Sequence, residues 1–391
     1  FPIFDKNKIV YLDTAASAQK PYKVIKCIED LYSNSYANVH RGVYSLSQKT
    51  TDKYEQSRET VKKFINAKSS KEIIFVRGAT EGINLVAEIM GKMTLSKNDE
   101  IILSRLEHHS NIVPWQMMCN KTKSKLKVIP LDKNGELDLK KFKSLISEKT
   151  KLVFLNHVSN ALGIINPIEE IIKISHHYDA IVLVDGAQSA AHFKIDLQKL
   201  NVDFFTASAH KLCGPTGVGF LYGKKELLEK IEPFMGGGEM ISDVTFDKTT
   251  YADIPHKFEA GTPNISGVIA FGVAIDYMNN IGFEKIRDYE DKLLTYATKK
   301  LKEIDDLIIY GDVKNKTSVI SFNITGLHSY DVGSILDKFG VAVRTGQHCA
   351  QPIMDHFNIP GTVRVSLSFV NTFKEIDILY EAIVKAKSML S

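Results

Sequence analysis

Residues 204–219 read FFTASAHKLCGPTGVG, an apolar run that enters a Ser-x-His-Lys corner and leaves it through a loop rich in glycine and proline. Lysine is ordinarily a solvated surface residue, but Lys211 lies between two runs with the composition of buried strands. Burial would lower the pKa of its amine and make it nucleophilic, and Ser208 and His210 can bind an anion such as a phosphate. The stretch therefore predicts a lysine that forms a Schiff base with pyridoxal phosphate. A strand-end lysine that faces water is the simpler alternative for so short a motif.

The size, charge and cysteine content of the chain exclude several classes of protein. With 391 residues, 44% of them hydrophobic, the chain can bury a large core, and one large domain with a smaller one is expected. The formal net charge is only +4 and the lysines are dispersed, which argues against binding to nucleic acid. No apolar run is long enough to span a bilayer. The four cysteines form no C-x-x-C pair, so we expect neither disulfides nor a metal site, and a reducing compartment.

Two compartments fit the sequence. The chain begins at Phe1 and not at methionine, as it would after removal of a targeting peptide. We therefore expect a plastid-type, apicoplast-like organelle, with the bacterial cytoplasm as the alternative.

Apolar runs alternate with helical patterns through the first two thirds of the chain. The runs at 73–76, 101–104, 152–155 and 180–184 lack a period of two, as expected of strands that are buried on both faces. Polar residues cluster just after each run, which is where ligands bind in open α/β sheets. The pattern predicts an α/β fold with a doubly wound, mostly parallel sheet and a site at its strand ends.

The pattern changes after residue 264. Helices are predicted at 266–280 and 289–304 and at 373–390, with short strands between them. Apolar residues at 363, 365, 367 and 369 alternate with Arg364, which places its side chain on the polar face of a strand. We expect a large domain at 16–275 and a small α+β domain at 276–391 that also includes residues 1–15.

Further polar residues complete the predicted cofactor site. In the segment 77–82, RGATEG, a glycine turn and a helix start with Thr80 as the expected N-cap would surround a phosphate with N–H groups; an ordinary cap explains it equally well. Asp185 ends a buried run and can keep a pyridine nitrogen protonated, which makes the ring an electron acceptor. Gln188 can donate to the phenolate oxygen, and His108 can stack on the ring. Each has a simpler explanation alone, but together they predict an enzyme that uses pyridoxal phosphate.

The sequence also contains a candidate nucleophile. Residues 343–352 read VRTGQHCAQP, a polar loop in which Cys349 lies beside His348 and near Arg344. Cationic neighbours favour the thiolate, which is the reactive form of cysteine. Arginine is also rare here, with seven positions among 50 basic residues, so those that remain are candidates for bidentate contacts that lysine cannot make. This criterion singles out Arg41, Arg344 and Arg364.

Six motifs, in order between about Tyr11 and Val370, resemble those of the class II (SufS-type) cysteine desulfurases of the aminotransferase class V family. They are NVHRG at 38–42, RGATEGIN at 77–84, EHHSN at 107–111, VDGAQ at 184–188, SAHK at 208–211 and RTGQHCA at 344–350.

The resemblance implies a fold-type I homodimer with a seven-stranded sheet that converts L-cysteine to L-alanine with pyridoxal 5′-phosphate. It implies that Lys211 carries the cofactor and moves the Cα proton, that Cys349 takes the sulfur as a persulfide, and that a SufE- or SufU-type acceptor protein collects it for iron–sulfur cluster assembly in the SUF system. The implied catalytic residues are Cys349, Lys211 and His108. The implied cofactor ligands are Lys211, Asp185, Gln188, His108, Thr80, Ala79, Ser208, His210, Asn160 and the partner subunit's Thr262. The implied substrate ligands are Arg364, Asn160, His40 and Arg344.

One position departs from the family pattern. Gln347 stands where many members have a second histidine, which leaves His348 as the only imidazole adjacent to the cysteine.

Three other functions are alternatives to a cysteine desulfurase. A selenocysteine lyase is the nearest of them, but selenide can leave without a nucleophilic thiol, so Cys349 favours desulfuration. In an aminotransferase, Cys349 would have no catalytic role. A non-catalytic scaffold would need neither Cys349 nor Lys211.

Overall fold

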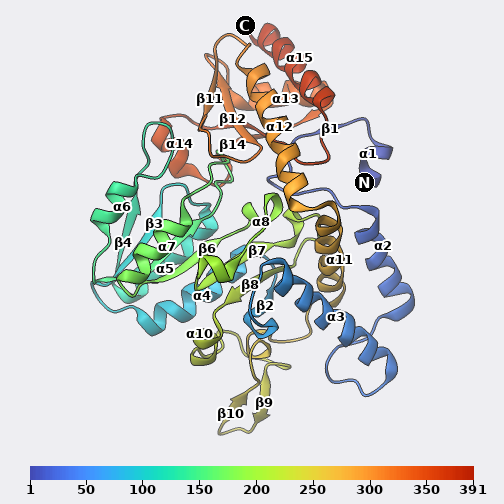
Figure 1. The fold of residues 1–391 in the computed structure, drawn as a ribbon, viewed down its shortest axis with the longest axis vertical. Helices are drawn as coiled ribbons and strands as arrows, with labels where there is room; N and C mark the ends of the chain where they lie inside the picture. The colour runs from blue at the N-terminus through green and yellow to red at the C-terminus, as the bar shows by residue number, and fades with distance from the viewer.

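A mixed, mostly parallel sheet of seven strands forms the centre of the computed structural model, which describes residues 1–391 (Figure 1). The strand order is β2-β8-β7-β6-β5-β3-β4. Strands β3 to β7 run parallel to one another, whereas β8 is antiparallel to both β7 and β2. The strands are β2 (Ile73–Val76), β3 (Glu100–Ser104), β4 (Lys125–Ile129), β5 (Thr150–Asn156), β6 (Ile181–Asp185), β7 (Phe204–Ser208) and β8 (Gly219–Gly223). The predicted α/β fold with a seven-stranded sheet is confirmed.

The sheet is buried on both faces, which explains the unbroken apolar runs. Successive residues of a strand point to opposite faces. In β5, Val153 and Leu155 pack into one hydrophobic core, while Leu152 and Phe154 pack into a second core on the other side. The helices before and between these strands are α1 (Pro2–Lys6), α2 (Tyr22–Asp30), α3 (Ser45–Phe64), α4 (Ala79–Thr94), α5 (Val113–Thr122), α6 (Leu139–Leu145), α7 (Ile168–His177), α8 (Ser189–His192) and α9 (Leu197–Leu200).

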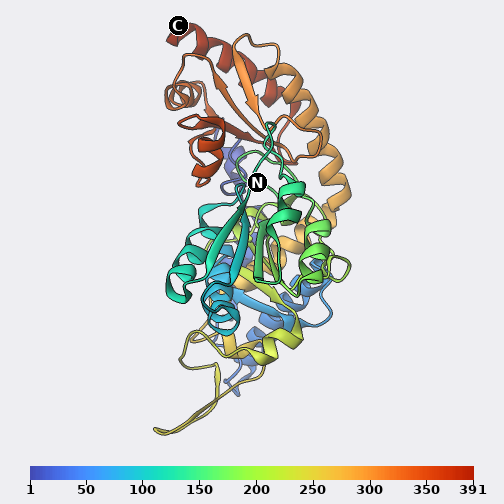
Figure 2. The same ribbon diagram turned by 90° about the vertical axis from the view of Figure 1, so that its left-hand side faces the viewer.

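The elements that directly follow β8 lie outside the seven-stranded sheet. Helix α10 (Lys225–Lys230) precedes an antiparallel hairpin of β9 (Ile241–Val244) and β10 (Thr249–Tyr251), which projects from the body of the molecule (Figure 2). Helix α11 (Ile265–Ile281) then lies against α2 and α3. Short helical turns occur at η1 (Leu31–Ser35), η2 (Ser70–Glu72), η3 (His109–Asn111), η4 (Ala209–Lys211) and η5 (His256–Phe258).

A second, antiparallel sheet of four strands lies at the other end of the molecule, in the order β11-β12-β15-β14 (Figure 1). The strands of this sheet are β11 (Leu307–Tyr310), β12 (Val319–Ile324), β14 (Arg344–Gly346) and β15 (Thr362–Ser366). The helices in this part of the chain are α12 (Phe283–Leu301), α13 (Ser329–Lys338), α14 (Gln351–Phe357) and α15 (Phe373–Leu390). The N-terminal segment reaches this region, because β1 (Val10–Tyr11) pairs with β13 (Val341–Ala342). The helix predicted at 373–390 is confirmed, and the division into domains at residue 275 stays a prediction.

Helix α12 begins six residues earlier than predicted. Gly282 has a φ of +93° and ends α11 in a conformation that favours glycine, and α12 follows at once. Phe283 and Ile286 pack into the core of the large sheet, while Leu293 and Ala297 pack into the core of the small sheet. The helix therefore joins both layers, and its first turn was missed because its apolar residues contact a core formed by distant parts of the chain.

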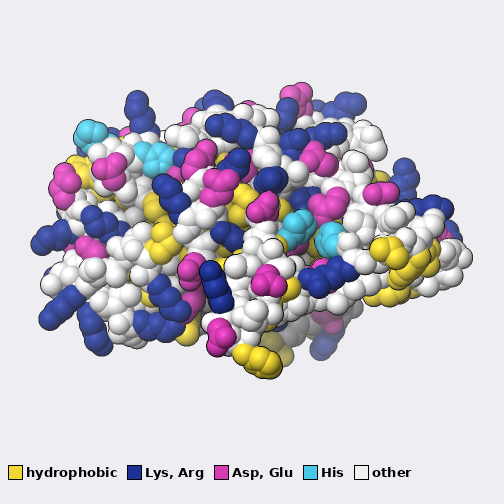
Figure 3. All heavy atoms as spheres, turned by 90° about the horizontal axis from the view of Figure 1, so that it is seen from below, with side chains coloured by type: hydrophobic (Ala, Val, Ile, Leu, Met, Phe, Trp, Pro, Cys, Tyr) yellow, Lys and Arg dark blue, Asp and Glu magenta, His cyan; other side chains and the backbone are white.

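The surface carries charges of both signs. Seen from below, lysine and arginine side chains are interspersed with aspartate and glutamate and do not form one continuous patch (Figure 3). This distribution agrees with the small net charge of +4. None of the helices combines the length and the apolar composition needed to cross a membrane.

Candidate active site

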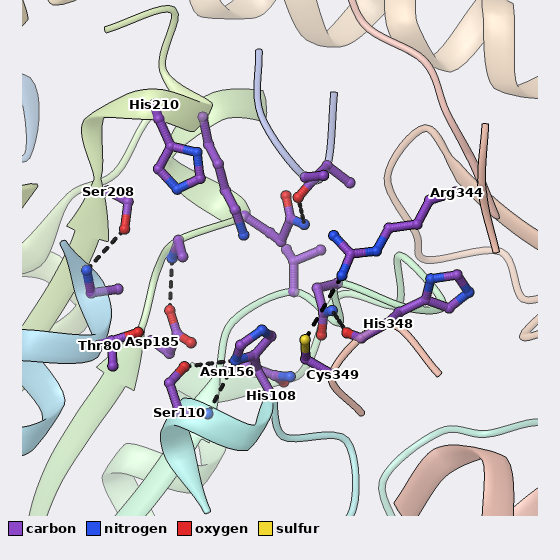
Figure 4. A pocket seen from close by; sticks show the side chains of 18 of the residues that line it. Thr80, His108, Ser110, Asn156, Asp185, Ser208, His210, Arg344, His348 and Cys349 are labelled. Carbon is purple, nitrogen blue, oxygen red and sulfur yellow. Dashed lines mark hydrogen bonds between the residues drawn. The ribbon is translucent and has the colours of Figure 1, made fainter. Parts of the chain in front are cut away.

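One pocket at the carboxyl ends of β5, β6 and β7 collects most of the predicted site residues (Figure 4). Ser208 and His210 lie on one side of it, and Arg344, His348 and Cys349 lie on the other. The predicted residues that line it are Ala79, Thr80, His108, Asn160, Asp185, Gln188, Ser208, His210, Lys211, Arg344, Cys349 and Arg364. The pocket therefore joins side chains from both sheets.

Lys211 is placed in the pocket by the turn η4, which directly follows β7. Burial lowers the pKa of its amine to about 8, although the nearby Asp185 carboxylate acts in the opposite direction. Arg364 and Arg344 lower it further because they repel the ammonium form. A substantial fraction of the amine is therefore neutral near pH 7–8, as a nucleophile or a proton acceptor requires.

Asp185 is the last residue of β6 and is buried at the floor of the pocket. Its Oδ1 accepts a hydrogen bond of 2.9 Å from the Ala187 N–H. No bond occupies its other oxygen, which remains available to a ligand. Burial raises the pKa of this carboxyl, and the Lys211 ammonium opposes that rise. A cationic group inside the pocket would therefore stabilise the ionised carboxylate.

The side of the pocket near α4 offers donors for an anion, but one prediction about it is wrong. Helix α4 begins at Ala79 with Gly78 at the N-cap, so Thr80 lies in the first turn and does not cap the helix. Ser208 Oγ accepts a 2.8 Å hydrogen bond from the Ala79 N–H, which holds this hydroxyl at the helix start. Burial lowers the pKa of His210 to about 4, so this ring is neutral at pH 7. The Thr80 N–H, which has no acceptor within the protein, and the hydroxyls of Thr80 and Ser208 are suited to a phosphate.

His108 is oriented by its neighbour Ser110, which the sequence did not single out. Its Nδ1 accepts a 3.1 Å hydrogen bond from the Ser110 N–H and lies 2.7 Å from the Ser110 hydroxyl. Because Nδ1 is an acceptor, the proton of the neutral ring is assigned to Nε2. Burial, assisted by the charge of Lys211, lowers the pKa of His108 to about 4. The ring is therefore neutral at pH 7.

Arg364 lies on the pocket-facing side of β15 and is 1% exposed, so the polar face predicted for this strand does not face solvent. Its Nη1 donates to the backbone oxygen of Asn160 at 2.9 Å, and its Nη2 forms a 2.8 Å ion pair with Asp13. No role for Asp13 was predicted from the sequence. It orients the guanidinium from a part of the chain 351 positions away. Its charge also offsets part of the cost of burying Arg364.

Cys349 lies in the loop between β14 and α14, with its sulfur 3.8 Å from Arg344 Nη2. The arginine is thus the cationic neighbour that the sequence predicted. His348 does not share this role. Burial lowers its pKa to about 3, and its Nε2 bonds to the Thr362 hydroxyl at 2.8 Å, so the ring is neutral.

Two predicted residues lie outside the pocket. His40 was expected on the substrate side, but its Nε2 bonds to Glu55 at 2.9 Å in a separate surface hollow that His256 also lines. In a single chain His40 therefore lies outside the pocket, and its expected role on the substrate side stays a prediction. Thr262 lines a further pocket with Phe75 and Phe258, and its expected contribution to a partner's site stays a prediction.

The donor set fits pyridoxal 5′-phosphate. Three buried polar atoms of pocket residues, Asn160 Oδ1, His348 Nδ1 and Arg364 Nε, have no hydrogen-bond partner within the protein, as expected of groups that face a polar ligand. Lys211 offers an amine for an aldehyde, Asp185 a carboxylate for a pyridine nitrogen, and Ser208 a hydroxyl for a phosphate.

Comparison with known proteins agrees with this chemistry. A family model described as aminotransferase class-V matches residues 10–379. A curated cysteine desulfurase from Shigella sonnei is 46% identical over 100% of this chain and 97% of its own length. A probable cysteine desulfurase from Synechocystis is 48% identical over 98% of this chain and 93% of its own length.

Two solved structures share the fold closely. The cysteine desulfurase CsdA from Escherichia coli matches with a TM-score of 0.93 at 38% identity, covering 98% of this chain and 96% of its own. A cysteine desulfurase from Thermococcus onnurineus matches with a TM-score of 0.95 at 40% identity, covering 100% of this chain and 96% of its own.

Proposed function

The chain belongs to the cysteine desulfurases of the aminotransferase class-V family, which use pyridoxal 5′-phosphate, and we propose that it supplies sulfur to iron–sulfur cluster assembly through a persulfide on Cys349. One observation carries the assignment of this residue. Lys211 from the large sheet and Cys349 from the loop beside the small sheet line the same pocket. A cofactor-binding lysine and a thiol nucleophile thus face one substrate.

We assign the contacts of the cofactor to residues that line the pocket. Bound pyridoxal phosphate supplies an electron sink that stabilises negative charge at the substrate Cα. Lys211 would hold the cofactor aldehyde and afterwards move the Cα proton. Asp185 would keep the pyridine nitrogen protonated, and His108, with its proton on Nε2, would contact the ring. Gln188, whose Nε2 donates to the Ala15 oxygen at 3.0 Å, would donate to the phenolate oxygen. Ser208, His210 and the first turn of α4 at Ala79 and Thr80 bind the phosphate.

The sulfur transfer itself is assigned to the cysteine loop. The Cys349 thiolate forms an S–S bond with the substrate sulfur while the substrate C–S bond breaks. The enzyme keeps the sulfur as a persulfide, and the remaining three-carbon unit gains a proton at Cβ and leaves as alanine. Arg344, 3.8 Å from Sγ, stabilises the anionic thiolate before the attack and the terminal persulfide sulfur after it.

Arg364 is the group that we assign to the substrate carboxylate, so Arg364→Lys should weaken binding of L-cysteine. Lysine keeps the charge but loses the fixed fork, and it cannot maintain the contacts to both Asp13 and Asn160. We expect a loss of about 1.5–3 kcal/mol, seen mainly as a higher KM in steady-state alanine assays. Arg105→Lys, at an exposed arginine outside the pocket, is the control. Unchanged KM and kcat in Arg364→Lys would show that the carboxylate is bound elsewhere.

We propose a homodimer and a small acceptor protein of the SufE or SufU kind as the partners of this enzyme. In the dimer, the partner subunit's Thr262 would complete the phosphate site. The cysteine loop is short, since only residues 347–350 separate β14 from α14. A loop of this length lets Cys349 reach the substrate but not a distant acceptor, so the acceptor must bind at the pocket mouth.

Release of the persulfide should therefore limit turnover. Alanine production is expected to be slow with cysteine alone, to rise severalfold with an acceptor protein, and to rise less with a small reductant. Rapid-quench measurement of the first turnover against the steady state tests this order of rates. If the first turnover were as slow as the steady state and an acceptor changed nothing, the chemical step would limit the rate. The compartment, organelle or bacterial cytoplasm, stays a prediction.

A further inference from the structure

The loop that carries Cys349 adopts a backbone conformation that needs external support. His348 has a φ of +54° and Cys349 a φ of +55°, so two successive residues with side chains lie in the left-handed region. This region is sterically unfavourable for residues that have a Cβ atom. Conformations of this kind persist only where surrounding contacts hold them. Contacts with neighbouring segments must therefore hold this loop in place.

Before the nucleophile, the loop is held by two side chains. Asn160 Nδ2 donates to the His348 oxygen at 2.7 Å, and the His348 ring bonds to Thr362. Asn160 already belongs to the predicted site. After Cys349, the loop is held by a different residue, His109.

His109 contacts the loop twice, on both sides of Ala350. Its backbone N–H donates to the Cys349 oxygen at 2.8 Å. Its ring Nε2 accepts a 3.1 Å hydrogen bond from the Gln351 N–H, which is the first amide of α14 and has no backbone acceptor. The first N–H groups of a helix lack partners within the helix, so a side-chain acceptor there fixes where the helix begins. His109 therefore joins the large sheet to the exit of the cysteine loop.

We propose that His109 is a positioning residue for Cys349: its ring anchors the Gln351 amide, and its backbone anchors the Cys349 carbonyl, so that the sulfur is held at attacking distance from the substrate. The inference rests on the proposed role of Cys349. His109 is absent from the pocket lining, whereas the adjacent His108 faces the cofactor site. The two neighbouring histidines thus serve different parts of the reaction.

Two substitutions separate the ring contact from a general structural role. In His109→Gln, the side-chain oxygen can occupy the place of Nε2 and accept from Gln351. In His109→Asn, the oxygen is one carbon closer to the backbone and cannot reach that amide. Both variants keep the backbone bond to Cys349. His356→Asn is the matched control, because His356 lies on α14 itself and its side chain forms a single hydrogen bond, to the backbone oxygen of Asp132.

The measurement is the rate of persulfide formation on Cys349 in a single turnover of the pyridoxal-phosphate-loaded enzyme, read by quenching and mass spectrometry. We expect His109→Asn to be slower by roughly 10- to 100-fold, since small misplacement of a reacting atom has effects of this size. His109→Gln should remain within about threefold of the wild type, and His356→Asn should match it. The visible spectrum of the bound cofactor, and its change when cysteine is added, should be the same in all four proteins.

The proposal is overturned if His109→Asn forms the persulfide at the wild-type rate, if His109→Gln is as slow as His109→Asn, or if the response of the spectrum to cysteine is lost. Amide hydrogen exchange in the wild type gives a second measurement that needs no variant. The Gln351 N–H should be protected from exchange, and an unprotected amide there would equally refute the contact. A wild type that forms no persulfide on Cys349 would instead refute the proposed function.

Discussion

Replacement of Lys211 by alanine is expected to lower alanine production from L-cysteine by at least about a thousandfold. The variant loses both the amine that holds the cofactor and the base that moves the Cα proton, and a positioned base alone contributes roughly 10²–10⁴-fold. Borohydride treatment of the wild type should fix the cofactor to the peptide that contains Lys211. The same treatment of Lys211→Ala should leave no cofactor on the chain.

Lys316→Met provides a demanding control for this prediction. Lys316 is also buried, and burial likewise lowers the pKa of its amine to about 8, but its Nζ donates to the Gly311 oxygen away from the pocket. If a low pKa alone selected the lysine, Lys316 would compete for the aldehyde. We expect the adduct to remain on Lys211 in this variant. A reduced adduct on any other lysine would contradict the assignment.

Replacement of Cys349 by serine should separate cofactor chemistry from sulfur transfer. Serine keeps the size and polarity of the side chain but lacks the nucleophilic thiolate, so neither persulfide nor alanine should form above background. The cofactor should remain bound, and its visible absorption should still respond to cysteine, because the residues that bind it lie on the large sheet.

Cys119→Ser is the control for the loss of a thiol. Cys119 is half-buried on α5, and burial raises its pKa, which makes it a poor nucleophile. This variant should retain full activity. Substantial alanine release by Cys349→Ser would show that the substrate sulfur leaves without attack by this residue.

The large sheet and the location of the site could be predicted from the sequence because both follow from local patterns. Apolar runs without alternation mark strands buried on both faces, and β3, β5, β6 and β7 all have this pattern. In parallel strands the carboxyl ends meet at one edge, so polar residues just after such runs, including Asp185, His108 and Lys211, converge there. The structure brings these three side chains into one pocket.

Contacts between distant segments could not be predicted in this way. Asp13 pairs with Arg364 only because the N-terminal segment runs beside β15, where Asp13 forms a parallel bridge with Ser366, and no feature near Asp13 marks that pairing. The rarity of arginine singled out Arg344 and Arg364 correctly as pocket residues but overlooked Arg58. The structure shows that Arg58 is 1% exposed and forms bonds of 2.6 and 2.9 Å to the two oxygens of Glu259.

The role of His109 illustrates the same limit. In the sequence it is one half of a histidine pair, of which only His108 was assigned a role. The difference arises because the chain turns at η3, which sends one ring into the pocket and the other towards α14. The positive φ of Cys349 is equally invisible in the sequence, since residues with a Cβ atom rarely adopt this conformation and nothing in the sequence marks cysteine as an exception.

The most direct test is to locate the sulfur after one turnover of the wild-type enzyme. The pyridoxal-phosphate-loaded protein is mixed with one equivalent of L-cysteine without acceptor or reductant, quenched, and digested for mass spectrometry. We predict one added sulfur atom on the peptide that contains Cys349 and one alanine released for each modified chain. Alanine formed without sulfur on Cys349, or sulfur carried by Cys27, Cys119 or Cys213 instead, would contradict the account.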